Sequence, residues 1–518
     1  MYVELTQAEL KQGHGPAAVP SWLKVSPGCA AIVGAPMGVP EIFVFHSTDL
    51  LIAGTSMPEV LTRLEEIQRS PTISAFAISQ FLHRGIVPAP YTEWEDIWLV
   101  GIGARVVLNS RPTGIDIDFE RVYPYVGSNS TGKSEPSTAM LLQLLTSAVD
   151  RQVADAGDEG FLMMSSGKDS VSVAVALAER GRDDISCATY RSDPTNTEND
   201  MAAEICRKLG LRHRTLDLPV DRDVVEERLV RFFEGSPRPC GDSAQIPYAL
   251  AVGESGLRAG AVLDGSGSDF YMGIIPSRSV KLKHRLRIRN ESVARSVEAL
   301  VPIHSSVNYL TRSRVPTSFP CRSFRFRDTS RFYDDVVETR AWWRTVSDET
   351  DSLDDVDLEG AVVRVFYDQA SVHLKAFVAA SASGMEAGLP YCDPAVADYA
   401  FNLPRSDRYD VKTGVSKILV RRMLLETIGY DADAVGKHFF SFAGDRFLRE
   451  HRGFVLAEIS SCDLWSDDVA ALAASWIDRL QRRPLLYHSL LMLFQLSGWY
   501  NHSRYVRQPS SEYGRLKR

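Results

Sequence analysis

The stretch that decides the fold is FLMMSSGKDSVSVAVALAERG, residues 161–181. Its first five residues have the apolar character of a short buried strand, and SVSVAVALAERG has the pattern of a helix that ends at Gly181. Between them lies SSGKDS, in which Gly167 lets the backbone approach an anion closely. The start of the helix adds unpaired N–H groups and a partial positive charge. The stretch therefore predicts a strand, a phosphate-binding loop and a helix.

Strands and helices alternate on both sides of this stretch. ISCATY (185–190), HRTLDL (213–218) and AVLDG (261–265) read as strands, and ENDMAAEICRKLG (198–210) reads as a helix. This alternation predicts an α/β fold, a parallel sheet with helices on both faces. Ligands of such sheets bind beyond the carboxyl ends of the strands.

The rest of the chain divides by composition. Residues 1–126 contain short apolar runs separated by Pro and Gly, which predicts a smaller, strand-rich N-terminal domain. Residues 127–138, GSNSTGKSEPST, predict a linker, and residues 139–518 form the second domain. From about residue 361 onward the pattern is mainly helical.

GSNSTGKS, residues 127–134, also fits a phosphate-loop pattern, G-x-x-x-x-G-K-[ST]. That pattern needs a strand before it and a helix that opens at the Lys-Ser pair. Pro124 lies in the middle of the preceding segment, and Glu135 and Pro136 follow the motif. We therefore expect the loop at residues 165–170 to bind the phosphates instead.

Two aspartates predict a magnesium site. Asp169 lies in the 165–170 loop, and Asp269 lies in LDGSGSDFYMG, a Gly-rich turn that follows a strand. Mg²⁺ is usually bound by one or two carboxylates together with substrate phosphates and water. We expect Asp169 and Asp269 to hold the metal. The expected nucleotide-binding residues are Ser165, Ser166, Gly167, Lys168, Asp169, Ser170, Gly265 and Gly267.

Over about residues 140–450 these motifs resemble the synthetase domain of the asparagine synthetase superfamily, which includes β-lactam synthetases and lasso-peptide macrolactam synthetases. SSGKDS is similar to that family's S-G-G-x-D-S motif, with Ser166 in place of the first glycine. GSGSDF is similar to G-x-G-x-D-E, with Phe270 in place of the glutamate. The other matching positions are Glu198, Ala202, Leu209, Gly210, His213, Lys375, Glu386, Pro390, Asp393, Lys417, Arg421, Lys437 and Phe440, whereas Thr197 and Gly388 depart from the pattern.

The resemblance implies an ATP-dependent ligase that adenylates a carboxylate, releases pyrophosphate and transfers the acyl group to an amine, with ATP and Mg²⁺. It implies that Lys437 stabilises the tetrahedral intermediate and that Glu386 takes part in amine activation. β-Lactam synthetases pair that glutamate with a tyrosine, where this chain has Ser266. Three alternatives stay open: Glu386 acts alone, the amine arrives neutral, or the base lies elsewhere. A structural role for Glu386 is equally open.

RGIVPAPYTEWEDIWLVGIGA, residues 84–104, resembles the segment that closes the family's glutaminase domain. The nucleophile of that domain is a cysteine directly after the initiator Met, where this chain has Tyr2. The resemblance therefore implies a degenerate glutaminase-like domain, no glutamine hydrolysis, and a lactam or peptide-like product. The partners would be a small-molecule or peptide carboxylate and an amine.

Composition excludes other classes. A formal net charge of -8 argues against a broad nucleic-acid surface. Seven scattered cysteines without a C-x-x-C pair argue against a disulfide framework or a zinc site. The polar N-terminus and the lack of a long apolar run predict a cytoplasmic protein with no membrane span. The basic run at residues 278–289 and the acidic run at 348–359 are interpreted as solvated surface.

Two other functions remain possible from the sequence. Nucleotide-activating enzymes that modify tRNA or transfer sulfur share the S-G-G-x-D-S loop. A degenerate nucleotide-binding scaffold protein would explain Ser166, Phe270 and Gly388, which replace motif residues. The sequence leaves the acid, the amine and the oligomeric state open.

Overall fold

The computed structural model describes residues 2–16, 19–156, 159–182, 184–191, 198–288, 290–301, 310–312, 314–317, 324–435, 442–483 and 486–506.

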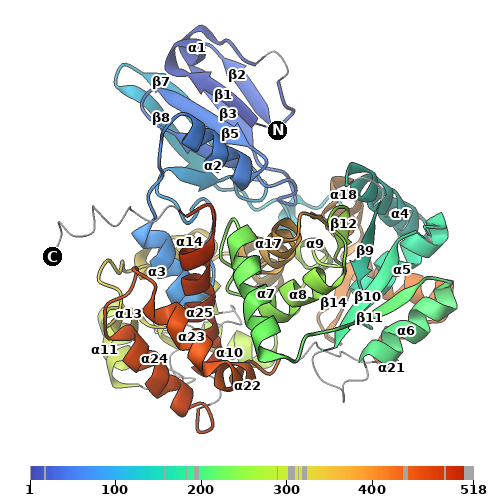
Figure 1. The fold of residues 1–518 in the computed structure, drawn as a ribbon. Coiled ribbons are helices and arrows are strands. Elements are labelled where there is room, and N and C mark those ends of the chain that lie inside the picture. The colour runs from blue at the N-terminus through green and yellow to red at the C-terminus, as the bar shows by residue number, and fades with distance from the viewer. Residues whose placement is uncertain are drawn as a thin grey trace.

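A five-stranded parallel sheet forms the centre of the larger part of the chain (Figure 1). Its strand order is β11-β10-β9-β12-β13, and every neighbouring pair is parallel. The central strands are buried along their whole length, because helices cover both faces. The predicted α/β fold is confirmed. The strands are β9 (Gly160–Met163), β10 (Ser186–Arg191), β11 (His213–Asp217), β12 (Ala261–Leu263) and β13 (Glu386–Gly388).

The helices that cover the sheet fall into two groups. One group contains α5, which connects β9 to β10, and α6, which connects β10 to β11, together with α4 and α20. The other group contains α8 and α17, which contact each other and the sheet. The bounds are α4 (Thr138–Asp155), α5 (Lys168–Arg180), α6 (Glu198–Leu209), α7 (Arg222–Gly235), α8 (Gln245–Glu254), α17 (Leu374–Ala382) and α20 (Ile418–Ile428).

The N-terminal part contains two four-stranded antiparallel sheets, with strand orders β1-β5-β4-β6 and β2-β3-β7-β8. Apolar side chains from both sheets share one core, so the sheets stack face to face (Figure 1). The elements are β1 (Tyr2–Thr6), α1 (Gln7–Gln12), β2 (Leu23–Ser26), β3 (Cys29–Val33), β4 (Phe43–His46), β5 (Leu50–Gly54), α2 (Met57–Glu66), β6 (Ile97–Leu99), β7 (Arg105–Arg111) and β8 (Gly114–Glu120).

The first 126 residues share a second core with the C-terminal helices. Helix α3 (Ala75–Arg84) packs against α25 (Leu486–His502), and Figure 1 shows it among the C-terminal helices, below the stacked sheets. A fully buried ion pair, Arg238 to Glu93 at 2.9 Å, also joins the two parts. The other C-terminal helices are α22 (Gly444–Glu450), α23 (Arg452–Ser460) and α24 (Val469–Asp478).

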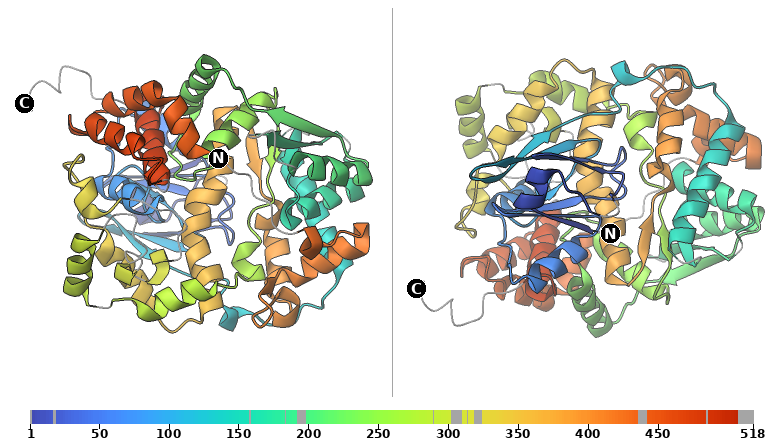
Figure 2. Two further views of the ribbon diagram at one scale, coloured as in Figure 1. Left: turned by 90° about the horizontal axis from the view of Figure 1, so that it is seen from below. Right: turned by 90° about the horizontal axis from the view of Figure 1, so that it is seen from above.

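A long, mainly helical segment connects β12 to β13 (Figure 2). Residues 355–382 are continuously helical and include two π-helical stretches, which often occur at functional sites. The elements are α9 (Asp269–Met272), α10 (Arg278–Leu286), α11 (Glu291–Leu300), α12 (Arg314–Thr317), α13 (Phe326–Thr329), α14 (Arg340–Glu349), α15 (Asp355–Asp357), η3 (Leu358–Val363), α16 (Arg364–Tyr367) and η4 (Asp368–His373).

The GSNSTGKS segment has the wrong local structure for a phosphate loop. Strand β8 ends at Glu120, the motif begins with the short helix η1 (Gly127–Asn129), and α4 does not start until Thr138. Asn402 accepts hydrogen bonds from the backbone N–H and the hydroxyl of Thr131 (2.8 and 2.9 Å). The segment therefore lies along the end of α18 (Pro394–Phe401).

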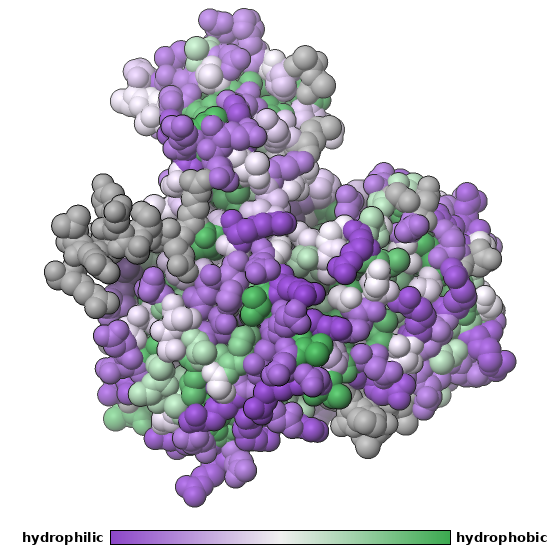
Figure 3. Space-filling view, viewed as in Figure 1, coloured by the Kyte–Doolittle hydropathy of each residue, from purple (hydrophilic) through white to green (hydrophobic). Residues whose placement is uncertain are grey.

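The surface seen in Figure 3 is mainly hydrophilic, with hydrophobic side chains in small groups. Among the described residues, no helix is both long and apolar enough to cross a bilayer.

Candidate functional site

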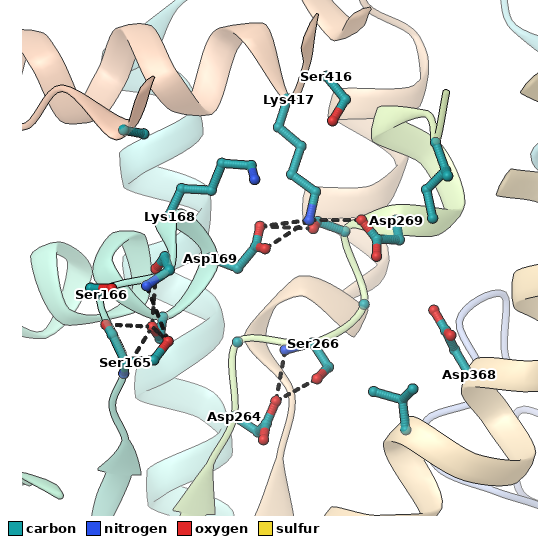
Figure 4. Close-up of a pocket in the computed structure, with 18 of the residues that line it drawn as sticks. Ser165, Ser166, Lys168, Asp169, Asp264, Ser266, Asp269, Asp368, Ser416 and Lys417 are labelled. Atoms are coloured by element: carbon teal, nitrogen blue, oxygen red, sulfur yellow. Dashed lines mark hydrogen bonds and ion pairs between the residues drawn. The ribbon is translucent and has the colours of Figure 1, made fainter. Parts of the chain in front are cut away.

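The loop between β9 and α5 is ordered by its own serines (Figure 4). Gly167 is the N-cap residue of α5 and has no side chain to cap the helix. The hydroxyls of Ser165 and Ser170 lie 2.8 Å apart, and the Gly167 N–H donates to the Ser165 hydroxyl at 3.1 Å. The first N–H groups of α5 are thus left without a capping side chain, which suits binding of an anion.

Ser166 lines the cavity, but its N–H and hydroxyl are bound to another residue. It is 1% exposed, and its N–H and its hydroxyl both donate to the buried carboxylate of Glu198, the hydroxyl at 3.0 Å. The Tyr430 hydroxyl donates to the Ser166 carbonyl. The serine that replaces the family's glycine therefore has a buried acceptor, and its hydroxyl is not available to a nucleotide.

Asp169 and Asp269 converge on one ammonium group (Figure 4). The Nζ atom of Lys417 lies 2.8 and 2.7 Å from the two carboxylate oxygens of Asp169 and 2.7 Å from Oδ1 of Asp269. Asp169 comes from the first turn of α5 and Asp269 from the start of α9, beyond the carboxyl ends of β9 and β12. The predicted metal pair is thus brought together, with Lys417 between the two carboxylates.

The charges in this cluster stabilise one another. Burial acts to raise the pKa of Asp269, but Lys417 and Arg364 outweigh it and lower this pKa to about 2. Burial acts to lower the pKa of Lys417, but Asp169 and Asp269 raise it above its usual range. Asp269 and Lys417 are therefore ionised at neutral pH.

Lys417 is held in an unusual backbone conformation. Its φ is 59°, in the left-handed region, which costs a non-glycine residue roughly 1–2 kcal/mol. It precedes α20 and follows a short hairpin of β14 (Tyr409–Asp410) and β15 (Val415–Ser416). Such strain is often found at functional sites. Here it accompanies the position of the ammonium between the two aspartates.

A cavity of about 760 Å³ opens at this cluster, a size within the range of small-molecule sites. A Cβ atom added at Gly265 would lie 2.7 Å from the backbone N of Ser170. One added at Gly267 would lie 2.6 Å from Sγ of Cys392. Gly265 therefore allows the turn after β12 to pack on the loop, and Gly267 allows it to pack on Cys392. The predicted residues that line the cavity are Ser165, Ser166, Gly167, Lys168, Asp169, Ser170, Gly265, Gly267 and Asp269.

The far wall of the cavity carries a second set of charged groups that sequence reasoning did not assign to the site. Nη1 of Arg364 lies 3.2 Å from Oδ1 of Asp368, one helical turn away. Burial raises the pKa of Asp368 to about 6, although Arg364 opposes this. One signal in the sequence could have predicted these residues. Every fourth position in this stretch lines the cavity (Arg364, Asp368 and Val372), and residues at that spacing share one face of a helix.

The cavity is also lined by three other polar residues, Tyr248, Asp264 and Lys375. The Tyr248 hydroxyl donates to Asp264 at 3.0 Å, and Lys375 lies 3.5 Å from Asp242. Asp264 directly follows β12, a position that α/β sheets use for ligands. Of these residues, sequence comparison noted only Lys375.

Glu386, the residue expected to take part in amine activation, lies away from the cavity that contains the two aspartates. Glu386 is the first residue of β13 and pairs with Ala261, the first residue of β12. The cavity lies at the other end of these parallel strands, beyond Leu263 and Gly388. Glu386 is exposed and is not among the described residues that line the cavity. Lys437, the other predicted catalytic residue, lies outside the described residues.

The residues present fit a magnesium ion bound together with phosphates. No group of three or more His, Cys, Asp or Glu side chains within the described part of the chain forms a metal site. Two converging carboxylates are nevertheless the donor set that Mg²⁺ uses when phosphate oxygens supply the other ligands. Asp169 and Asp269 provide those carboxylates next to the N-terminus of α5.

The fold and the site are typical of an α/β enzyme that uses a nucleotide. They combine a parallel sheet, a glycine-containing loop before a helix, and a cavity beyond the strand ends. The model of the asparagine synthase family matches residues 140–428, more than half of the chain. The chain belongs to the asparagine synthase family, whose members are ATP-dependent amide ligases that use ATP as substrate, usually with Mg²⁺. No curated protein matches the chain.

Proposed function

We propose that this ligase activates a carboxylate as an acyl-adenylate, with release of pyrophosphate, and transfers the acyl group to an amine. The observation that supports this is the convergence of Asp169 and Asp269 on Lys417, beside the N-terminus of α5. A carboxylate does not react with an amine at neutral pH because oxide is a poor leaving group. Attachment of AMP supplies a good leaving group.

The residues divide between phosphate and metal. The N–H groups at the start of α5 and the ammonium of Lys168 face the cavity and would bind the phosphates. Asp169 and Asp269 would hold Mg²⁺, which neutralises phosphate charge when bound. Lys417 offers a third positive charge at the same place and would stabilise charge that develops on the leaving pyrophosphate. Lys437 is proposed to stabilise the tetrahedral intermediate.

We propose that a residue other than Glu386 activates the amine, because Glu386 lies at the far end of β13 from the cavity. Asp368 lines the cavity, keeps one oxygen without a bond from Arg364, and has a pKa of about 6. A base of that pKa is largely unprotonated at neutral pH and still accepts a proton usefully. We therefore propose Asp368 as the proton acceptor.

The amine is proposed to come from the substrate rather than from glutamine, and the product to be a lactam or peptide-like amide of natural-product biosynthesis. Within residues 1–126 the sequence has one cysteine, Cys29. It begins β3 beside the β2–β3 turn, and its thiol has only a weak contact, 3.8 Å, to the Ala30 carbonyl. Among the described residues, no base forms a hydrogen bond with the Cys29 thiol.

An ATP–pyrophosphate exchange screen against carboxylic acids and peptides tests the proposal. At least one acid should stimulate exchange in the wild-type chain, and Asp169→Asn and Asp269→Asn should abolish it while the far-UV circular dichroism spectrum stays unchanged. Near-normal exchange in either variant would contradict the metal assignment. Hydrolysis of ATP to ADP and phosphate would contradict adenylation.

A further inference from the structure

A second cavity lies beside the GSNSTGKS segment, the motif that the nucleotide site does not use. Its volume is about 410 Å³, and the Gly127–Gly132 segment, Arg405, Arg408, Asp354 and Asp357 line it. It shares none of its described lining residues with the catalytic cavity.

Among the described residues, Arg408 has no carboxylate in direct contact, although Asp357 of the same cavity attracts it from farther away. Arg408 is 6% exposed, and among the described residues its only hydrogen bond runs from Nη1 to the carbonyl of Tyr271 at 3.2 Å. Its Nε is buried without a partner. The Nε–Nη2 edge of a guanidinium is the edge that binds a carboxylate or a phosphate through two parallel hydrogen bonds. The guanidinium lies over the rings of Phe401 and Tyr409, 5.1 and 5.6 Å from their centroids, and an anion bound at the unused edge would stabilise it further.

The remaining charges narrow the class of ligand. Asp357 lies against the backbone of Gly127. A Cβ atom added at Gly127 would be 3.1 Å from each carboxylate oxygen of Asp357. Asp354 lies 3.8 Å from Arg405. Two arginines and two aspartates leave the cavity without net charge, which disfavours a doubly charged phosphate and suits a ligand that carries one charge of each sign.

We propose that this cavity binds a free amino acid, with its carboxylate on the Nε–Nη2 edge of Arg408 and its ammonium toward Asp357. The ligand would supply the carboxylate in direct contact that Arg408 does not have among the described residues. The loop at Gly127–Gly132 then serves as one wall of an amino-acid site rather than as a phosphate loop.

Two residues that line the cavity, Arg408 and Tyr409, contact the segments that carry Asp269 and Lys417. Arg408 donates to the carbonyl of Tyr271, in the short helix that begins with Asp269. Its neighbour Tyr409 pairs with Ser416, the residue before Lys417. An occupant of the cavity would contact Arg408 and Tyr409, which are bonded to the two segments that carry the catalytic ion pair. We therefore expect it to alter ATP–pyrophosphate exchange, an expectation that rests on the proposed function.

Isothermal titration calorimetry on the full chain tests the site with the common free amino acids, acetate, methylamine and inorganic phosphate as probes. We expect at least one amino acid to bind with one-to-one stoichiometry, and acetate and methylamine to bind more weakly. Arg408→Lys keeps the charge but not the two-donor edge, and Asp357→Asn removes the partner of the ammonium. Each should weaken binding by about tenfold or more. Asp357 is only half-buried, so this variant decides the test if Arg408→Lys does not fold.

Two matched variants locate the bound ligand. Arg422→Gln removes an arginine outside the cavity that pairs with Asp407 at 3.1 Å, and Asp169→Asn alters the catalytic cavity. Both should leave amino-acid binding unchanged. Binding that is lost in Asp169→Asn but kept in Arg408→Lys would place the ligand in the catalytic cavity and overturn the proposal. Binding of phosphate without any amino acid, or of no probe at all, would also overturn it. Unchanged exchange with a bound amino acid would overturn the coupling alone.

Discussion

The ammonium of Lys417 lies 2.7 Å from a carboxylate oxygen of Asp269, at the position where a magnesium ion was expected. The same ammonium contacts both oxygens of Asp169. In this arrangement a lysine neutralises two acidic side chains that would otherwise repel each other. The two carboxylates that would hold a magnesium ion are thereby kept close together.

Replacement of Lys417 by methionine should make the stability of the chain depend on magnesium. The variant leaves Asp169 and Asp269 together without their cation. Lys417 is buried, but the two carboxylates are 28% and 36% exposed, so the free energy of unfolding should fall by at most about 3 kcal/mol, the lower end of the range for a fully buried pair. Mg²⁺ should restore part of this loss because it binds the same carboxylates. Thermal denaturation with and without Mg²⁺ measures the effect.

The control for this prediction is the double variant Lys417→Met with Asp169→Asn, which should respond to Mg²⁺ much less. An equal rise in melting temperature for the wild type, the single variant and the double variant would show that Mg²⁺ acts elsewhere.

Replacement of Ser166 by alanine should lower stability more than it lowers activity. The hydroxyl of Ser166 donates to the buried carboxylate of Glu198 at 3.0 Å. A hydrogen bond to a charged group contributes about 1.5–3 kcal/mol, and this is the expected loss in the free energy of unfolding by urea. ATP–pyrophosphate exchange should stay within a few-fold of wild type. A selective loss of exchange in Ser166→Ala, with normal stability, would mean that the hydroxyl binds nucleotide.

Variants of Glu386 and Asp368 test which of these two carboxylates activates the amine. Glu386→Gln should leave product formation unchanged, because this exposed side chain lies at the amino end of β13. Asp368→Asn should lower product formation by about 10²-fold or more while exchange falls less, since a general base acts after adenylation. Product assays and exchange assays on both variants check this. The reverse ranking would restore Glu386 as the base.

The pair of His502 and Glu458 should make stability depend on pH. Nε2 of His502 lies 2.9 Å from both Glu458 oxygens, and this hydrogen bond raises the pKa of His502 above 6.5. A histidine whose pKa is raised on folding contributes its full stabilisation at pH values below its pKa in the unfolded chain. This contribution is lost as the pH rises through its pKa in the folded chain. His502 is partly exposed, so the effect should be at most about 1 kcal/mol.

Urea unfolding of wild type and His502→Gln at pH values on either side of neutrality measures this contribution. The wild type should lose its advantage over the variant at the higher pH. A difference between the two proteins that is the same at both pH values would exclude the protonated histidine as its source.

Local sequence determined the sheet and the two acidic loops. The apolar run at residues 161–164 and the glycines that follow it are short-range signals, because strand burial and close backbone approach depend on neighbouring residues. The same signals indicated the shared edge at which Asp169 and Asp269 meet.

Only the tertiary structure decided which charges complete the site. Lys417, Asp368 and Arg364 come from segments that follow or interrupt the sheet, and their distances to Asp169 and Asp269 depend on how a long helix and a hairpin pack. Glu386 matched a family motif, yet the register of β13 against β12 places it at the other end of the strands. Sequence specifies residue type and local geometry, whereas the approach of distant side chains is set by packing of the whole chain.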